Sequence, residues 1–250
     1  VAKDHSCVLL DGGDVKCWGR GSYSGVLGTD AYSSDRRAIV GADGETTWTS
    51  DLNLVLGDTP EETGDGIPIV DLGDGLTAIS VSTATDHTCV ILSTGAVKCW
   101  GERAPGLPWT GWGKQVGDSP ADLPDIDLGS GRTAVQISTG PEGTCAILDN
   151  GNLKCWGINI EGQLGLGYYG GAVGGNPEEM GDNLPPIDLG TGRTAAMVYQ
   201  ANYSTCAVLD NGDLKCWGQN SSGQLGQGHR EPVGDEPDET GDNLPRVDLG

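Results

Sequence analysis

The stretch Cys145–Gly157 reads CAILDNGNLKCWG, and the rest of the chain is organised around it because it is repeated. The same thirteen-residue phrase stands as CVLLDGGDVKCWG at Cys7–Gly19, CVILSTGAVKCWG at Cys89–Gly101 and CAVLDNGDLKCWG at Cys206–Gly218. Four copies in 250 residues make this a repeat protein.

Each copy consists of two short apolar runs on either side of a turn, which is the pattern of a β-hairpin. The third turn residue is glycine in every copy: Gly13, Gly95, Gly151 and Gly212. A three-residue hairpin loop favours glycine there because the backbone is left-handed at that position. Alternation along the strands places Cys145, Ile147, Leu153 and Cys155 on one face, and Ala146, Leu148, Lys154 and Trp156 on the other. Both faces carry apolar side chains, so we expect each hairpin to be covered on both sides.

The cysteines are expected to pair within the hairpins. Centring the turn on Asn150 places Cys145 directly opposite Cys155. Opposed Cα atoms of an antiparallel pair lie about 4.5–5.5 Å apart, a spacing that a disulfide accepts. We therefore predict the disulfides Cys7–Cys17, Cys89–Cys99, Cys145–Cys155 and Cys206–Cys216. Zinc is the competing explanation, but nine residues separate the members of each pair, whereas zinc ribbons bring closely spaced cysteines together on one ion.

Charge and cysteine usage limit the partners and the compartment. The formal charge is −22, from 36 acidic and 14 basic residues, which argues against binding to nucleic acid or to anionic membranes. It permits cationic partners or calcium. Eight paired cysteines indicate an oxidising environment, so we expect an extracellular or secreted protein. No signal peptide and no run of membrane-spanning length is visible, so a leader is expected to have been removed or to lie outside this segment.

Two glycosylation sequons are present, at Asn202-Tyr203-Ser204 and Asn220-Ser221-Ser222. Asn202 precedes a predicted strand and is the better candidate for a glycan. Asn220 occupies a repeated position that Asn159 shares, where a buried amide that bonds the backbone is the alternative. Both sites together make glycosylation an expectation for this chain.

Segments ending in Asp-Leu-Gly separate the hairpins, at Gly73, Gly129, Gly190 and Gly250. Their apolar ends (IVDLG, DIDLG, PIDLG and RVDLG) are interpreted as a short strand, and the alternating runs that follow (LTAISVS, RTAVQIS and RTAAMVY) as another. With the two hairpin strands, each repeat then has four strands in about sixty residues, which is typical of a β-propeller blade. We divide the chain into repeats at 1–73, 74–129, 130–190 and 191–250, with an insertion at 29–56 in the first.

The third and fourth copies continue as WGINIEGQLGLG (Trp156–Gly167) and WGQNSSGQLGQG (Trp217–Gly228). This phrase resembles the repeat of the regulator of chromosome condensation family. The likeness covers nearly all of the chain outside 29–56, but it is weaker in the first copy and eroded in the second.

The resemblance implies an all-β propeller of four-stranded blades, in which these four repeats form part of a larger array of seven or more blades. A closed four-bladed ring, or an arc completed by a neighbouring subunit, is the alternative. The paired cysteines resemble those of secreted members of this class.

Several recurring polar residues have a structural interpretation. His5 and His87 occupy the same repeat position and are expected to serve the scaffold. The recurring lysines are interpreted as solvated edge charges, with a repeated acidic partner as the alternative: Lys16, Lys98, Lys154 and Lys215. The acidic loops are interpreted as a solvated rim, with calcium binding as the alternative: Asp58, Glu61, Glu62, Asp65, Glu178, Glu179, Asp182, Asp235, Asp238, Glu239 and Asp242. No catalytic set, cofactor or metal site is expected.

We expect a non-enzymatic structural or protein-interaction module that binds through variable loops, chiefly 29–56 and 102–116, or assembles with neighbouring subunits. Trp48, Trp109 and Trp112 lie in these loops and are the predicted partner-binding anchors, although they could instead cover blade edges. A carbohydrate-binding or calcium-dependent extracellular module is the alternative. The family's best-known activity, guanine-nucleotide exchange on a small nuclear GTPase with chromatin binding, is not expected, because the predicted compartment and the acidic charge do not suit it.

Overall fold

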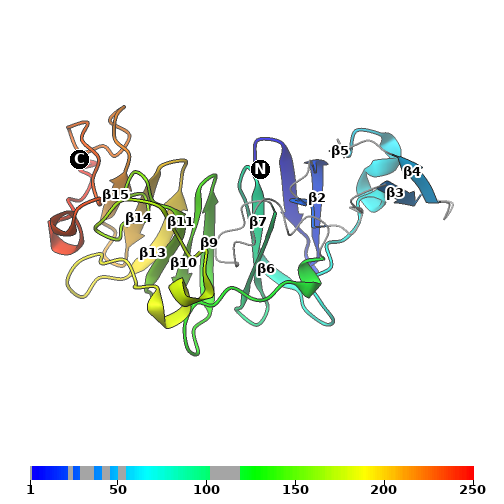
Figure 1. The fold of residues 1–250 in the computed structure, drawn as a ribbon, viewed down its shortest axis with the longest axis horizontal. Coiled ribbons are helices and arrows are strands. Elements are labelled where there is room, and N and C mark those ends of the chain that lie inside the picture. Colours follow the sequence, from blue (N-terminus) through cyan, green and yellow to red (C-terminus); the bar gives the residue numbers. More distant parts are fainter. Residues whose placement is uncertain (1, 22–24, 29–36, 41–45, 50–54, 102–118) are drawn as a thin grey trace. The chain divides into compact units, whose positions relative to one another are not determined.

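The structure is a computed structural model that describes residues 2–21, 25–28, 37–40, 46–49, 55–101 and 119–250, with the backbone alone for 37–40 and 46–49. These residues fall into two compact units. The first unit comprises the described residues up to 101 together with 119–126, and the second is Asp127–Gly250. The regular elements of the described residues are antiparallel β-strands and short 3₁₀ helices (Figure 1).

The first unit contains two three-stranded sheets and a separate hairpin. One sheet has the order β1 (His5–Leu9), β2 (Val15–Arg20) and β5 (Val55–Leu56). The other has the order β6 (Ala78–Thr83), β7 (His87–Leu92) and β8 (Val97–Gly101). The separate hairpin pairs β3 (Arg37–Val40) with β4 (Thr46–Thr49), and it lies inside the predicted insertion. The 3₁₀ helices here are η1 (Pro60–Glu62), η2 (Gly64–Gly66) and η3 (Pro120–Asp122).

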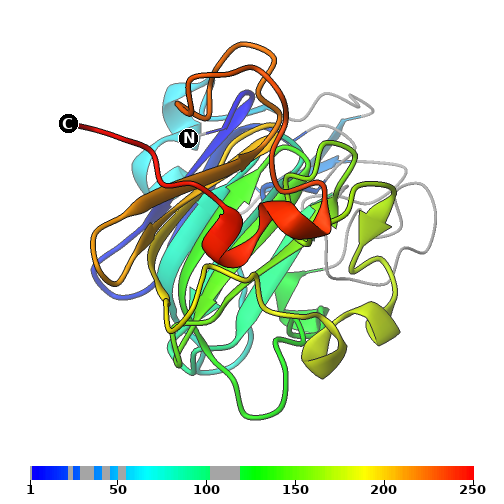
Figure 2. The same cartoon turned by 90° about the vertical axis from the view of Figure 1, so that its left-hand side faces the viewer.

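The second unit contains two sheets that lie side by side (Figures 1 and 2). The first has four strands, β9 (Ala134–Gly140), β10 (Gly143–Leu148), β11 (Leu153–Ile158) and β12 (Ala172–Val173). The second has three, β13 (Ala195–Gln200), β14 (Ser204–Leu209) and β15 (Leu214–Gly218). The 3₁₀ helices are η4 (Pro177–Glu179), η5 (Gly181–Asn183), η6 (Pro237–Glu239) and η7 (Gly241–Asn243).

The four hairpins have the predicted register, with Cys145 opposite Cys155 and the equivalent match in each other copy. The turn glycine is left-handed in all four copies, with φ between 80° and 87°. All four predicted disulfides are present, each joining Cα atoms 4.1 Å apart. The all-β fold class and the stapled hairpins are therefore as the sequence predicts.

Burial on both faces agrees with the prediction for the hairpins of repeats 2 and 3, whereas β1 and β14 in repeats 1 and 4 are only partly buried, and Val8 of β1 is exposed. Every residue of β7, β8 and β10 is buried. In the second unit the core combines Cys145, Ile147, Leu153 and Cys155 with Leu189, Leu209 and Trp217. This core takes side chains from both sheets, so each sheet covers one face of the other.

The position of the fourth strand is a correction. We expected it in the Asp-Leu-Gly segments, but in repeat 3 it is β12, which pairs with the outer edge of β11. The Asp-Leu-Gly segment makes only a short contact, such as the bond from Ile187 N to Leu153 O. Two features prevent a longer ladder in this segment. Proline precedes it and lacks an N–H group, and the Asp188 carboxylate accepts the N–H of Gly190 (2.9 Å), which diverts the backbone into a local turn.

Candidate interaction surface: repeat contacts and neck loops

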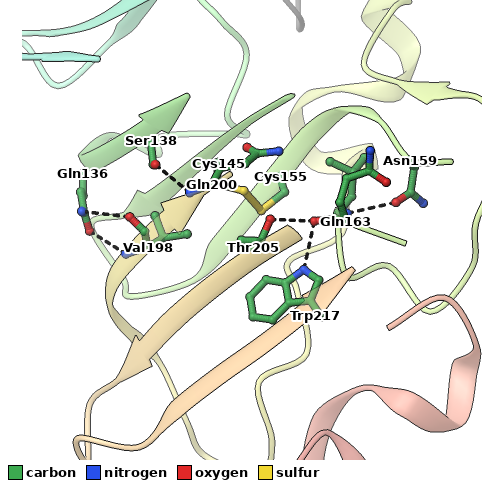
Figure 3. The surroundings of a disulfide bond; sticks show 11 residues. Gln136, Ser138, Cys145, Cys155, Asn159, Gln163, Val198, Gln200, Thr205 and Trp217 are labelled. Atoms are coloured by element: carbon green, nitrogen blue, oxygen red, sulfur yellow. Dashed lines mark hydrogen bonds between the residues drawn. A yellow bond between two sulfur atoms is a disulfide. The ribbon is translucent and has the colours of Figure 1, made fainter. Parts of the chain in front are cut away.

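Neighbouring repeats are joined through one backbone carbonyl. In the second unit, the carbonyl of Gln163 accepts hydrogen bonds from Thr205 Oγ1 (2.8 Å) and Trp217 Nε1 (3.1 Å), both in repeat 4 (Figure 3). The indole ring lies so close to Gly165 that a Cβ atom there would be 2.6 Å from Nε1. The equivalent set in the first unit is Val26, Thr88 and Trp100. This contact explains why glycine, threonine and tryptophan recur together.

The innermost strands of repeats 3 and 4 are joined by side chains that imitate a β-ladder. The Gln136 amide accepts the N–H of Val198 (3.0 Å) and donates to its carbonyl (3.3 Å) (Figure 3). Two positions along, Ser138 Oγ accepts the N–H of Gln200 (2.9 Å). The edge of β13 that faces β9 is therefore satisfied by side chains rather than by another strand.

The interpretation of the lysines as solvated edge charges is wrong for three of them. Lys98, Lys154 and Lys215 are only 5%, 6% and 8% exposed. Lys215 Nζ donates to the carbonyls of Leu189 (3.0 Å) and Gly241 (2.7 Å), and Lys154 makes the same pair of bonds one repeat earlier. Burial lowers the pKa of both amines. Charge-assisted bonds of this kind contribute about 1.5–3 kcal/mol each, so these lysines stabilise the contacts between repeats.

The recurring acidic residues also have backbone partners. Asp242 accepts hydrogen bonds from the N–H (2.8 Å) and hydroxyl (2.5 Å) of Thr191, and Asp182 does the same with Ser130. These bonds lower the pKa of both carboxyls. Glu239 accepts the N–H groups of Gly234 and Glu236, as Glu179 does at the equivalent place in repeat 3. Asp182, Asp242, Glu179 and Glu239 therefore recur because they hold loops in place, which gives their repetition a structural reason that does not need calcium.

His5 and His87 lie in the scaffold of the first unit. His5 is 3% exposed, and its Nε2 lies 3.0 Å from Thr88 Oγ1. The Thr88 hydroxyl donates to the Val26 carbonyl, so His5 Nε2 is the donor to Thr88. Burial lowers the pKa of His5 to about 4 and that of His87 to about 3. Both rings are therefore neutral at physiological pH, and His5 serves the contact between repeats 1 and 2.

In repeats 1, 3 and 4, a loop leaves the second hairpin strand and returns to pair with it; we call this segment the neck loop. The closing pairs are Gly19↔Leu56, Gly157↔Val173 and Gly218↔Val233. In repeat 1 the neck loop contains the 29–56 insertion, including β3 and β4. The predicted partner-binding insertion therefore occupies the same place as the loops of repeats 3 and 4.

The neck loop of repeat 3 is held in shape by Asn159, which is fully buried. Its Oδ1 accepts the N–H of Leu164 (3.0 Å) and its Nδ2 donates to the carbonyl of Tyr168 (2.7 Å). Its backbone exchanges two further bonds with Gly170 and Gly171. Tyr168 and Tyr169 nevertheless remain 48% and 65% exposed. A buried amide thus presents two large aromatic side chains to solvent on a loop of defined shape.

The neck loop of repeat 4 uses Asn220 in the same way. Its Nδ2 donates to the carbonyl of His229 (3.0 Å) and its Oδ1 accepts the N–H of Leu225 (3.1 Å). Beside this loop is an open hollow of about 370 Å³. Its lining residues are His229, Glu231, Pro232, Val233, Asp238, Glu239, Asn243 and Pro245.

The predicted site residues have different outcomes. Trp48 lies in β4, opposite Ala38, whereas Trp109 and Trp112 lie outside the described residues. Asn202 is exposed, in the turn before β14. Asn220 is 1% exposed and has the buried-amide role that its repeat position suggested. Glycosylation at either asparagine stays a prediction.

Tyr168 and Tyr169 were not among the predicted site residues, because the predicted anchors were tryptophans in the two most variable loops. The signal that could have identified them is their position, with two residues between them and the Gly-Gln-Leu-Gly phrase, in the region where repeat 1 has its insertion. Among the described residues, no group of three or more His, Cys, Asp or Glu side chains is placed to hold a metal ion.

Within the described part of the chain, no helix has the length and apolar character needed to cross a membrane.

Disulfide-stapled antiparallel sheets with recurring tryptophan and lysine contacts between neighbouring repeats define a repeat protein of the β-propeller class. The model of the regulator of chromosome condensation (RCC1) repeat matches residues 3–24, 134–163 and 202–224. These three segments are therefore repeats of this family. Repeat 2 lies outside the matched residues, as expected from its eroded motif.

The chain is similar to two curated proteins of Arabidopsis thaliana over most of its length. It is 30% identical to the ultraviolet-B receptor UVR8 over 232 residues, which is 90% of this chain and 42% of the receptor. It is 24% identical to the mitochondrial RCC1 domain-containing protein RUG3 over 225 residues, which is 89% of this chain and 42% of that protein. The chain thus spans less than half of these relatives.

Solved structures show the same fold. Human WBSCR16 superposes with a TM-score of 0.60 at 20% identity, covering all of this chain and 52% of the solved one. Yeast RCC1 (Prp20), solved bound to Kap60, superposes with a TM-score of 0.61 at 16% identity, covering all of this chain and 48% of the solved one. About half of each solved chain is therefore matched.

Proposed function

We propose that this chain is a non-enzymatic, secreted protein-interaction module that binds its partners through the neck loops. The observation that carries the proposal is the loop of repeat 3, where buried Asn159 fixes a backbone that exposes Tyr168 and Tyr169. Rigid, exposed aromatic side chains supply large contact areas at a low cost in conformational entropy, and they dominate binding at many protein interfaces.

The scaffold supports a binding role because its polar residues are already engaged in joining the repeats. His5 and Lys215 each bond across a repeat boundary, and Asp242 holds the first residue of repeat 4, Thr191. Four disulfides support an oxidising compartment. Yeast RCC1, which shares the fold, has been solved in complex with the protein Kap60.

Site-specific photocrosslinking tests the proposal. A photoreactive phenylalanine analogue replaces Tyr169, and a matched variant carries the same analogue at Asn150, an exposed hairpin tip in the same repeat. Extracts and secretions of the source organism are irradiated, adducts are identified by mass spectrometry, and each protein found is then titrated in purified form. We expect protein adducts from position 169 that position 150 does not give, and weaker binding when Tyr168 and Tyr169 are both changed to alanine.

Two results would contradict the proposal. Equal adducts from both positions would show that the neck loop is not the contact surface. Binding of glycans on an array, lost in the Tyr168→Ala/Tyr169→Ala variant and without protein adducts, would favour the carbohydrate-binding alternative.

A further inference from the structure

The neck loop of repeat 3 lies against the acidic turn of repeat 4, defined as residues 235–239. The N–H of Gly167 donates to the carbonyl of Gly234 (3.3 Å), and a Cβ atom on Gly167 would lie 3.2 Å from the Cα atom of Pro237. Tyr168 follows Gly167, and consecutive Cα atoms are ~3.8 Å apart. The Cα atoms of Tyr168 and Pro237 therefore lie within about 9 Å of each other.

The backbone therefore places exposed aromatic residues and exposed acidic residues in one region of the surface. Tyr168 and Tyr169 are exposed on one side, and Asp238, the residue after Pro237, is exposed on the other. The face of a tyrosine ring is electron-rich and attracts cations, as a carboxylate does. A cationic group on an alkyl chain, such as a lysine or arginine side chain, therefore suits both the tyrosine rings and the carboxylates.

The hollow beside the acidic turn adds a place for such a side chain. Asp238 and Glu231 line it and are both exposed, while Pro232, Val233 and Pro245 supply apolar walls. A lysine or arginine stem packs on apolar surface and keeps its charged end against carboxylates. Glu239 also lines the hollow, but its carboxylate is held by backbone N–H groups, and burial together with Asp235 raises its pKa. Asp238 and Glu231 are therefore the carboxylates that remain for a ligand.

We propose that Tyr168, Tyr169, Glu231 and Asp238 form a binding surface for a basic, extended protein segment, with an arginine or lysine entering the hollow. This inference rests on the proposed function, because it names the chemistry of the partner that the neck loops bind. The net charge of −22 supports it, since a strongly acidic protein attracts basic segments at long range. The long-range attraction is general, and the tyrosines then determine where on the surface the basic segment binds.

The test is a titration of the whole chain with a fluorescein-labelled peptide rich in arginine and lysine, followed by fluorescence anisotropy. An acidic peptide of equal length is the negative control. Changing both Tyr168 and Tyr169 to alanine should weaken binding about tenfold, which is the loss expected for two exposed cation–π contacts. Changing Glu231 to glutamine and Asp238 to asparagine should also weaken it and flatten its salt dependence. Arg230→Gln should tighten binding, because Arg230 is exposed beside Glu231 and repels a cation.

A charge-matched control separates local recognition from general attraction. The Asp11→Asn/Asp74→Asn variant makes the same change in net charge at two exposed positions of the first unit. Binding that weakens equally in this variant, or that does not respond to loss of the tyrosines, overturns the inference. Peptide binding that is absent altogether also overturns it. The proposed function would survive these outcomes if position 169 still crosslinks to proteins that have no basic segment.

Discussion

The indole Nε1 of Trp217 donates to the backbone carbonyl of Gln163, 3.1 Å away, and so fastens the stapled hairpin of repeat 4 to a loop of repeat 3 (Figure 3). Gln163 is part of the same neck loop that Asn159 shapes, because Asn159 Oδ1 accepts the N–H of Leu164, the next residue. The segment that joins two repeats therefore also presents Tyr168. Stability of the scaffold and shape of the binding surface depend on the same few hydrogen bonds.

Replacing Trp217 with phenylalanine should destabilise the chain measurably. The change removes the Nε1 donor and leaves the Gln163 carbonyl with Thr205 alone, at a cost of about 1–2 kcal/mol in the free energy of unfolding, to which lost packing adds. Denaturant unfolding monitored by circular dichroism measures this. Trp18→Phe is the matched control, because Trp18 is only half-buried and no hydrogen bond from it to a carbonyl is found among the described residues. An equal loss in both variants would contradict the role given to the bond.

Removing one disulfide should cost about 3 kcal/mol, because each staple closes a short loop and restricts the unfolded chain. The Cys145→Ala/Cys155→Ala variant removes one without leaving a free thiol. Its free energy of unfolding is compared with that of the parent chain before and after reduction. Thiol labelling should find none of the eight cysteines in the native protein and all eight after reduction under denaturing conditions. Labelling of native cysteines without reduction would contradict the four pairs.

Replacing Lys215 with methionine should destabilise the chain by about 2–4 kcal/mol, since it removes two charge-assisted hydrogen bonds and leaves the carbonyl of Leu189 without a donor, whereas the carbonyl of Gly241 keeps the N–H of Leu244. The control is Lys16→Met. Lys16 is half-buried and bonds only the carbonyl of Gly64 in the described structure, so its loss should cost less than about 1 kcal/mol. Thermal and denaturant unfolding of both variants check the difference. Similar costs would mean that burial at position 215 contributes little.

Acidification should lower the free energy of unfolding through the two buried histidines of the first unit, at a higher pH than that at which Asp182 and Asp242 become protonated. His5 and His87 have folded pKa values of about 4 and about 3, below the value of 6.5 in the unfolded chain. Below pH 6.5 the unfolded chain therefore binds protons that the folded chain does not bind. The free energy of unfolding should be at its full value above pH 6.5 and fall as the pH decreases toward 4, by roughly 1.4 kcal/mol per pH unit for each histidine.

Unfolding experiments between pH 7 and pH 5 check this slope, because ordinary carboxyl pKa values of about 4 lie below this range, and the raised pKa of Glu239 is common to the parent chain and the histidine variant. The His87→Gln variant should lose part of the pH dependence, whatever its effect on stability at pH 7. The folded pKa values of Asp182 and Asp242 are lowered, so their contribution is lost only at more acidic pH, as it falls through their folded pKa. An unchanged slope in the histidine variant would show that another group titrates there.

Local features of the fold could be predicted from the sequence. The hairpin register, the left-handed Gly151 and the Cys145–Cys155 pair all depend on residues within a span of about a dozen positions, which sequence spacing determines directly. The lysines could not be placed in this way. Lys215 is buried because carbonyls 26 residues away, before and after it, converge on its Nζ atom, and only the arrangement of repeats brings them there.

The sequence pointed to a class of loop but not to the residues of the candidate surface. The loops at 29–56 and 102–116 were expected to bind, which stays a prediction, and the closing pair of the 29–56 insertion is equivalent to that of the loop that holds Tyr168. The tyrosines themselves were not identified, because their exposure depends on how Asn159 folds the loop around a buried amide. Similarly, the fourth strand was assigned to the wrong segment, since pairing of β12 with β11 follows from loop closure rather than from β-propensity.

In a secretory host, Asn202 should carry an N-linked glycan and Asn220 should not. Asn202 is exposed in a turn, whereas the Nδ2 atom of Asn220 donates to the carbonyl of His229 inside the neck loop. Direct substitution of Asn220 would disturb that loop, so the sequons are better removed at their serines, with Ser204→Ala and Ser222→Ala. Digestion with a peptide N-glycosidase, followed by intact mass measurement, should show a glycan that Ser204→Ala abolishes and Ser222→Ala leaves unchanged. A glycan that depends on Ser222 instead would mean that Asn220 is modified before the loop closes around it, and that the neck loop of repeat 4 then differs from the structure described.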